Sequence, residues 1–174
     1  LVQDGDANII VLSAMSGTTD SLLAIAHAMS QGNGREVKQL IGLLEDKYKK
    51  VIADLFPNSN GLAKAEEMIA SYFRSMYDLI NTASFLPAHE CALLAHGELL
   101  STSIFHLLLQ ENSIPAVFLP ALEFMRINES GVPDMEYIEV HLKQLLDQYP
   151  DCNLFITQGF ICRNDSGAID NLKR

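Results

Sequence analysis

The segment Asn8-Ile-Ile-Val-Leu12, followed by Ser13-Ala-Met-Ser-Gly17-Thr-Thr-Asp20, decides the fold class. A continuous run of apolar, mostly β-branched residues is typical of a strand that is buried on both faces of a parallel sheet. The small and polar residues after it, with Gly17, indicate a turn. Apolar residues at helical spacing then predict a helix; they are Leu22, Leu23, Ile25, Ala26 and Met29. Strand, turn and helix in succession form the unit from which α/β proteins are built.

The middle of the chain is predicted to be helical. Apolar residues three and four positions apart predict amphipathic helices over 35–56, 62–84 and about 89–111. Pro57 and Gly61 lie between the first two helices, and this short connection predicts that they pack as an antiparallel hairpin.

Strand patterns return after the helices. Residues 114–119 and 153–157 predict strands, residues 120–133 a polar loop, and residues 134–148 a helix. Strands that alternate with helices indicate an α/β layered sandwich with a mainly parallel central sheet and a large helical insertion over about 20–111.

The bulk composition limits the class of function. The chain has 174 residues, enough for one domain, and its net charge of −10 argues against a nucleic-acid groove. No apolar run approaches the length of a membrane span, so we expect no membrane partner. Three cysteines without CxxC spacing indicate a reduced, cytoplasmic setting.

Two sites follow from where the strands end. In open parallel sheets ligands bind beyond the carboxyl ends of the strands, which here are Ser13–Asp20 and the segment 158–174. The first combines hydroxyl groups with the start of a helix, where free N–H groups can bind an anion. Ordinary capping of the helix by Thr18, Thr19 or Asp20 is the alternative.

Glu98 is a third candidate. It follows Gly97 inside a predicted helix, where glycine costs about 1 kcal/mol relative to alanine. That cost is explained if another segment or a ligand approaches closely, and Glu98 would then be an enclosed carboxylate that can hold an ammonium group. A solvated glutamate on a polar helix face is the alternative.

The other candidate residues give weaker indications of a functional site. His89 and His96 share a helix face, but a third zinc ligand is not evident, and we expect no metal site formed by protein ligands alone. The cysteines are expected to be buried apolar residues. The segment 126–129 fits either a binding loop or a solvated turn.

Three segments together resemble motifs of the aspartokinases, within the amino acid kinase family. They are Val11-Leu-Ser-Ala-Met-Ser-Gly-Thr-Thr-Asp20, His96-Gly-Glu-Leu-Leu-Ser101 and Phe155-Ile-Thr-Gln-Gly-Phe-Ile161. The resemblance covers almost the whole chain. It implies transfer of the γ-phosphoryl group of ATP, with Mg²⁺, to the side-chain carboxylate of L-aspartate. This is the first step towards lysine, threonine and methionine, and some members are fused to homoserine dehydrogenase.

The resemblance also implies roles for single residues. Thr19 and Glu98 would contact aspartate, and Gly159 and Phe160 would form a wall of its pocket. Arg174 would clamp an aspartate carboxylate and act in catalysis. Ser13, the other catalytic candidate, and Gly17 would lie near the phosphate groups of ATP.

The family's opening lysine motif and its later nucleotide lobe are not found in the 174 residues. We therefore expect a partial catalytic domain over 1–174, truncated at both ends and inactive by itself, that binds L-aspartate and forms a homo-oligomer. Another amino acid kinase, such as a glutamate or carbamate kinase, is the first alternative. The second is a non-catalytic helical interaction module, which would expose a large apolar face on helices 35–56 or 62–84.

Overall fold

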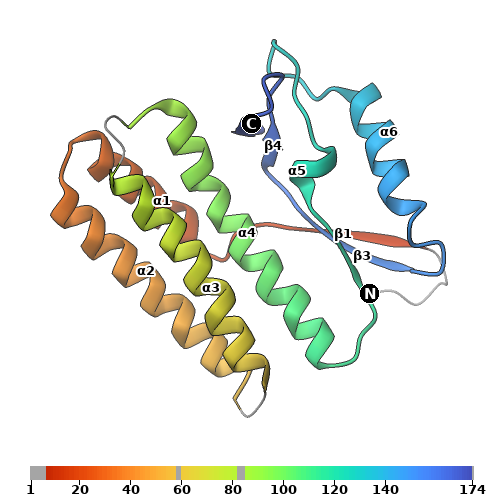
Figure 1. The fold of residues 1–174 in the computed structure, drawn as a ribbon, viewed down its shortest axis with the longest axis horizontal. Coiled ribbons are helices and arrows are strands. Elements are labelled where there is room, and N and C mark those ends of the chain that lie inside the picture. The colour runs from red at the N-terminus through yellow and green to blue at the C-terminus, as the bar shows by residue number, and fades with distance from the viewer. Residues whose placement is uncertain (1–6, 58–59, 82–84, 174) are drawn as a thin grey trace.

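A computed structural model describes residues 7–57, 60–81 and 85–173 as an α/β fold (Figure 1). The strands are β1 (Asn8–Leu12), β2 (Val117–Leu119), β3 (Leu154–Gln158), β4 (Ile161–Arg163) and β5 (Ile169–Asn171). The helices are α1 (Thr18–Ser30), α2 (Gly34–Leu55), α3 (Asn60–Asp78), α4 (Pro87–Glu111), α5 (Ala121–Phe124) and α6 (Met135–Leu146), with a short 3₁₀ helix at Leu79–Asn81.

The central sheet is parallel, as predicted. Its strand order is β1-β3-β2, so the last of the three strands in sequence lies between the other two. Ile156 at the centre of β3 pairs with Ile10 on one side and with Phe118 on the other. All three strands therefore end at the same edge of the sheet, where Leu12, Leu119 and Gln158 lie.

Helices cover the two faces of this sheet. On one face, Phe118 stacks on His106 of α4 with ring centroids 5.6 Å apart. On the same face, the side-chain Nε2 of Gln158 donates to Thr102 Oγ1 of α4 at 3.2 Å. On the other face, Phe155 belongs to a hydrophobic cluster with residues of α5 and α6. The layered arrangement is visible in Figure 1, where α4 and α6 lie on either side of the strands.

One expectation about β1 is wrong. Ile9 and Val11 are 41% and 61% exposed, so the strand is not buried on both faces. β1 is an edge strand of the described sheet, and α6 packs over Phe155 and Val117 rather than over β1. The apolar run in the sequence records only that the residues are apolar, not which neighbours cover them.

The helical insertion forms as predicted. Helices α2 and α3 form an antiparallel hairpin (Figure 1) that packs against α1 and α4. Tyr48 of α2 and Phe73 of α3 meet edge to face, with centroids 5.9 Å apart and both rings buried. In α2 and α3 the large apolar side chains that are exposed among the described residues are Leu43 and Leu55, both on α2. They do not form the broad face that an interaction module would need.

The structure differs from the predicted elements in three places. Strand β2 begins at Val117 rather than at 114, and the short helix α5 lies inside the expected polar loop. The segment after β3 is not a simple turn, because β4 and β5 form an antiparallel hairpin. Gly167, with φ of 82°, lies in the turn of that hairpin, where a left-handed backbone suits glycine.

Helix α4 runs through the centre of the molecule. Among the described residues it alone is long and apolar enough to cross a membrane by length and composition, with a mean hydropathy of 1.4 over 18 residues. Half of these 18 residues are buried inside the fold, and α4 packs against α1, α3 and the strands. The buried core helix of a globular protein has the same composition.

Candidate active site

The turn after β1 leaves helix α1 without a side-chain cap. The Thr18 amide donates to the Met15 carbonyl at 3.0 Å, and Gly17 is the N-cap residue with φ of 72°. No side chain accepts a hydrogen bond there, so the capping alternative is not what the structure contains. Within the described residues, the amides of Thr19 and Asp20 have no protein acceptor. They are therefore free to bind an anion.

Gly97 is required because the β1 turn lies against α4. A Cβ atom at Gly97 would lie 2.8 Å from Ala14 Cβ and 3.4 Å from Leu22 Cδ1, and the first distance is too short for two carbon atoms. The expectation that another segment approaches this glycine is confirmed.

Glu98 is an enclosed carboxylate. It is 5% exposed, and its Oε1 accepts a hydrogen bond from the Ala14 amide at 3.3 Å. Burial raises the pKa of this carboxyl, and the Ala14 hydrogen bond opposes the shift. The solvated alternative is therefore wrong. The amides of Ala14 and of Glu98 itself satisfy only part of the acceptor capacity of the carboxylate, which suits a cationic ligand.

One cavity brings five of the proposed site residues together. Its volume is ≈ 560 Å³, and it is lined by Ser13, Gly17, Thr19, Glu98 and Phe160. They come from three parts of the chain: the turn after β1 together with the start of α1, helix α4, and the residue after β3. The rest of the lining consists of Ala14, Met15, Ser16, Asp20, Leu172 and Lys173.

The two remaining predicted residues are not in this lining. Gly159 follows β3, and its amide donates a hydrogen bond to the Leu12 carbonyl of β1 at 2.9 Å. Its neighbour Phe160 has φ of 62°, a left-handed conformation that is uncommon for a bulky residue. Arg174 lies outside the described residues.

Three further side chains contact the segment that follows β1, and the sequence analysis predicted none of these contacts. Tyr48 of α2 is buried, and its hydroxyl lies 3.2 Å from Thr18 Oγ1. Lys47 Nζ donates to the Ser16 carbonyl at 2.6 Å, and Ser101 Oγ donates to the Ser13 carbonyl at 2.8 Å. Tyr48 belongs to the apolar stripe of its helix, which predicts no contact with the turn after β1. Ser101 ends the segment 96–101 that carries the resemblance, but no contact with Ser13 was predicted for it.

The cavity contains charges of both signs. Asp20 and Glu98 line it together with Lys173. Mg²⁺ is usually bound by one or two carboxylates together with substrate phosphates, so the exposed Asp20 is the residue that could hold it here. Among the described residues, no group of three or more His, Cys, Asp or Glu could hold a metal by itself.

The other candidates have structural contacts. His96 Nε2 lies 2.6 Å from Ser75 Oγ, and its Nδ1 lies 2.9 Å from the Ala92 carbonyl, so both ring nitrogens are engaged. Cys162 is buried, whereas Cys91 and Cys152 are half-buried. Arg126 lies over the ring of Tyr137 at 4.7 Å, which favours a structural role for the 126–129 segment.

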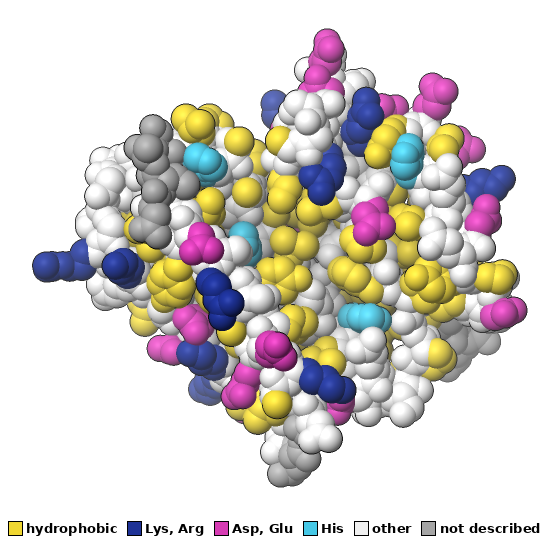
Figure 2. All heavy atoms as spheres, in the orientation of Figure 1, with side chains coloured by type: hydrophobic (Ala, Val, Ile, Leu, Met, Phe, Trp, Pro, Cys, Tyr) yellow, Lys and Arg dark blue, Asp and Glu magenta, His cyan; other side chains and the backbone are white. Residues whose placement is uncertain are grey.

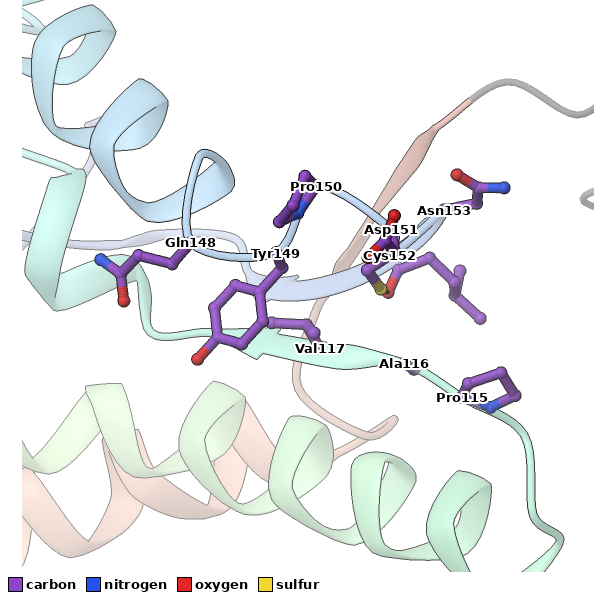
Figure 3. A pocket seen from close by; sticks show the side chains of 10 residues that line it. Pro115, Ala116, Val117, Gln148, Tyr149, Pro150, Asp151, Cys152 and Asn153 are labelled. Atoms are coloured by element: carbon purple, nitrogen blue, oxygen red, sulfur yellow. Dashed lines mark hydrogen bonds between the residues drawn. The ribbon is translucent and has the colours of Figure 1, made fainter.

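The surface in Figure 2 has lysine and arginine interspersed with aspartate and glutamate, and its hydrophobic side chains gather in the middle of that view. A second cavity of ≈ 590 Å³ lies near the start of β2 and β3, and its lining includes Pro115, Tyr149 and Cys152 (Figure 3). It is therefore at the opposite end of the sheet from Glu98 and Ser13.

The fold has close structural neighbours. It matches E. coli aspartokinase III in complex with lysine and aspartate with a TM-score of 0.65 and 27% identity, over 98% of this chain and 38% of the other. The same enzyme in complex with aspartate and ADP matches with a TM-score of 0.60 over 95% of this chain and 37% of the other. Clostridium acetobutylicum aspartate kinase matches with a TM-score of 0.69 at 19% identity, which supports the fold alone. The class is thus an α/β protein with an amino acid kinase-like fold.

Sequence comparison makes the relationship more specific. The chain is 30% identical over 188 aligned residues to the lysine-sensitive aspartokinase 3 of E. coli K12, matching 100% of this chain and 38% of that enzyme. It is 29% identical over 167 residues to the bifunctional aspartokinase/homoserine dehydrogenase 2 of the same organism, matching 92% of this chain and 20% of that enzyme. No family model matches. The chain is similar to these aspartokinases and spans less than half of their length.

Proposed function

We propose that residues 1–174 form the aspartate-binding part of an aspartate kinase catalytic domain, with a helical insertion over about 20–111. The reaction is transfer of the ATP γ-phosphoryl group to the side-chain carboxylate of L-aspartate, the first step of lysine, threonine and methionine biosynthesis. The observation that supports it is the cavity in which Ser13, Thr19, Glu98 and Phe160 meet, together with the similarity to aspartokinases.

Glu98 is proposed to hold the α-ammonium group of aspartate. The carboxylate is buried and accepts from the amides of Ala14 and of Glu98 itself, and a cationic partner would compensate its buried charge. Thr19 and Phe160 line the same cavity, and the Thr19 hydroxyl can donate or accept a hydrogen bond there. Arg174 is proposed to clamp a carboxylate of aspartate, because arginine pairs with carboxylates through two parallel hydrogen bonds.

The phosphate end is proposed to lie at the start of α1. Ser13, Gly17 and the free amides of Thr19 and Asp20 provide the kind of donors that bind phosphate. ATP with Mg²⁺ would supply the phosphoryl group and neutralise part of its charge. The acceptor carboxylate is ionised at neutral pH, so the protein needs no general base and works by positioning the two anions.

Calorimetric titration of the 174-residue chain with L-aspartate and with succinate tests the binding proposal. Succinate lacks the ammonium group, so Glu98→Ala should abolish most of the binding of L-aspartate and change that of succinate little. Equal losses for both ligands would contradict the role of Glu98, and a preference for L-glutamate would favour another amino acid kinase.

The chain alone is proposed to be inactive. Incubation with ATP, Mg²⁺, L-aspartate and hydroxylamine should yield no aspartyl hydroxamate, whereas its formation would refute this part of the proposal. A cytoplasmic location and a homo-oligomeric assembly are proposed as well, and sedimentation of the purified chain measures the assembly.

A further inference from the structure

We propose that Lys47 is a positioning residue for the phosphate end of the site, an inference that rests on the proposed function. Lys47 belongs to α2, in the helical insertion, and is separated by 31 positions from the residue it contacts. Its Nζ donates to the Ser16 carbonyl at 2.6 Å and lies 3.6 Å from the position that a Cβ of Gly17 would occupy. Lys47 therefore forms a hydrogen bond with the peptide unit that joins Ser16 to Gly17.

That peptide unit has two available orientations. Residues 15–18 form a turn closed by the hydrogen bond from the Thr18 amide to the Met15 carbonyl, and Gly17 has φ of 72° and ψ of 0°. These angles are those of the third residue of a type II turn, which needs glycine. The type I turn differs chiefly by rotation of the central peptide, here Ser16–Gly17, and Gly17 can adopt either form.

Lys47 selects one orientation. The C=O and N–H groups of a trans peptide point in opposite directions, because the unit is planar. Since the Ser16 carbonyl is held towards the Lys47 ammonium, the Gly17 N–H points away from Lys47. In the described part of the chain this N–H has no protein acceptor, and Gly17 lines the cavity beside Thr19 and Asp20.

Lys47 also brings a positive charge that the protein does not neutralise locally. Within the described residues no carboxylate lies within ion-pair distance of its Nζ, although the chain carries a net charge of −10. An anion at the start of α1 would be attracted by this charge and would receive the amide that Lys47 orients.

The residue next to Lys47 is anchored in the core. The next residue, Tyr48, is fully buried and contacts Thr18 through its hydroxyl group. Two neighbouring residues of α2 thus contact the same turn, one through a buried hydroxyl and the other through an ammonium group. The helical insertion thereby sets the geometry of the turn that begins α1.

The test is an NMR titration of the ¹⁵N-labelled 174-residue chain with inorganic phosphate, read at the amides of Gly17, Thr19 and Asp20. Lys47→Met should weaken phosphate binding roughly tenfold, or about 1.4 kcal/mol, and should shift the free Gly17 amide signal. Lys47→Arg should stay near the unmodified chain, because it keeps both the charge and a donor. Lys50→Met is the matched control, since it removes the same charge from an exposed position of the same helix and should change little.

The outcomes separate the two proposals. Equal effects of Lys47→Met and Lys50→Met, or no saturable response of these amides in the unmodified chain, would overturn the role of Lys47. Lower thermal stability of Lys47→Met with unchanged phosphate affinity would overturn it too, because it would show a purely structural contact. L-aspartate affinity should be the same in all these variants, and its absence in every variant would instead count against the proposed function.

Discussion

Replacing Gly97 by alanine tests how closely the β1 turn and α4 must approach. The added methyl group would lie 2.8 Å from Ala14 Cβ, an atom attached directly to the backbone of the turn. It therefore cannot be relieved by rotation of a flexible side chain. The turn has to move away from α4, and this movement lengthens the 3.3 Å hydrogen bond from the Ala14 amide to Glu98.

Two opposing terms set the size of the effect. Alanine in a helix interior is favoured over glycine by about 1 kcal/mol. An extra methyl group in a packed site costs about 1–3 kcal/mol. The net change should lie between about 0 and 2 kcal/mol of destabilisation, which lowers Tm by roughly 2–4 °C per kcal/mol for a chain of this size.

Gly42→Ala calibrates the helix term. Gly42 lies inside α2, and the nearest neighbour of an added Cβ is Tyr77 Oη at an ordinary 3.9 Å. This variant should be stabilised by up to about 1 kcal/mol. Urea unfolding of both variants then gives the cost of the contact as their difference, which should be about 1–3 kcal/mol.

The double variant Gly97→Ala with Ala14→Gly identifies the contact responsible. Removing the Ala14 methyl group makes room for the new one, so the two changes should be coupled favourably by about 0.5–3 kcal/mol. Aspartate affinity should fall in Gly97→Ala and recover in the double variant. A gain in stability of Gly97→Ala equal to that of Gly42→Ala would refute the close approach.

Two further predictions concern titrating groups. Burial raises the pKa of Glu98, so its ionisation destabilises the folded chain as the pH rises through that pKa. Glu98→Gln should therefore raise Tm at pH 7, and the difference in Tm between this variant and the unmodified chain should vanish at about pH 4 and below. A difference in Tm that is constant across this range would contradict the assignment. Burial also raises the pKa of the Cys162 thiol to about 11, with Asp170 and Cys91 adding to the shift. Iodoacetamide at about pH 8 should therefore alkylate Cys162 more slowly than the half-buried Cys152 until urea unfolds the chain, and early labelling of Cys162 would show that it is accessible.

Much of the fold could be predicted from local patterns. The helices of the insertion and the strands 8–12 and 153–157 appear within a few residues of their expected limits, because long periodic stretches carry strong signals. The two strands of the β4–β5 hairpin and helix α5 were missed. Each has only three or four residues, and their stability comes from contacts such as that of Arg163 with the Leu122 carbonyl.

Part of the candidate site was predicted from where the strands end and from the motif resemblance, since Ser13, Thr19 and Phe160 line one cavity with Glu98. A broken local rule was a further signal. Gly97 inside a helix indicated a close approach, and the structure places Ala14 there. Lys47 and Tyr48 broke no rule in their own helix. Their contacts with the turn after β1 depend on how α2 packs against α1, and a single sequence does not encode that register in any local pattern.

Helix α4 belongs to both hydrophobic clusters of the molecule. Leu93, Leu100 and Ile104 pack with α1, α2 and α3, whereas Ala95 packs with the strands, α5 and α6. The two clusters thus share one helix, and we expect it to couple the stability of the two halves of the protein. Because Glu98 lies on that shared helix, partial unfolding of either half would expose the carboxylate. Ligand bound at Glu98 should therefore protect the amides of both halves from hydrogen exchange.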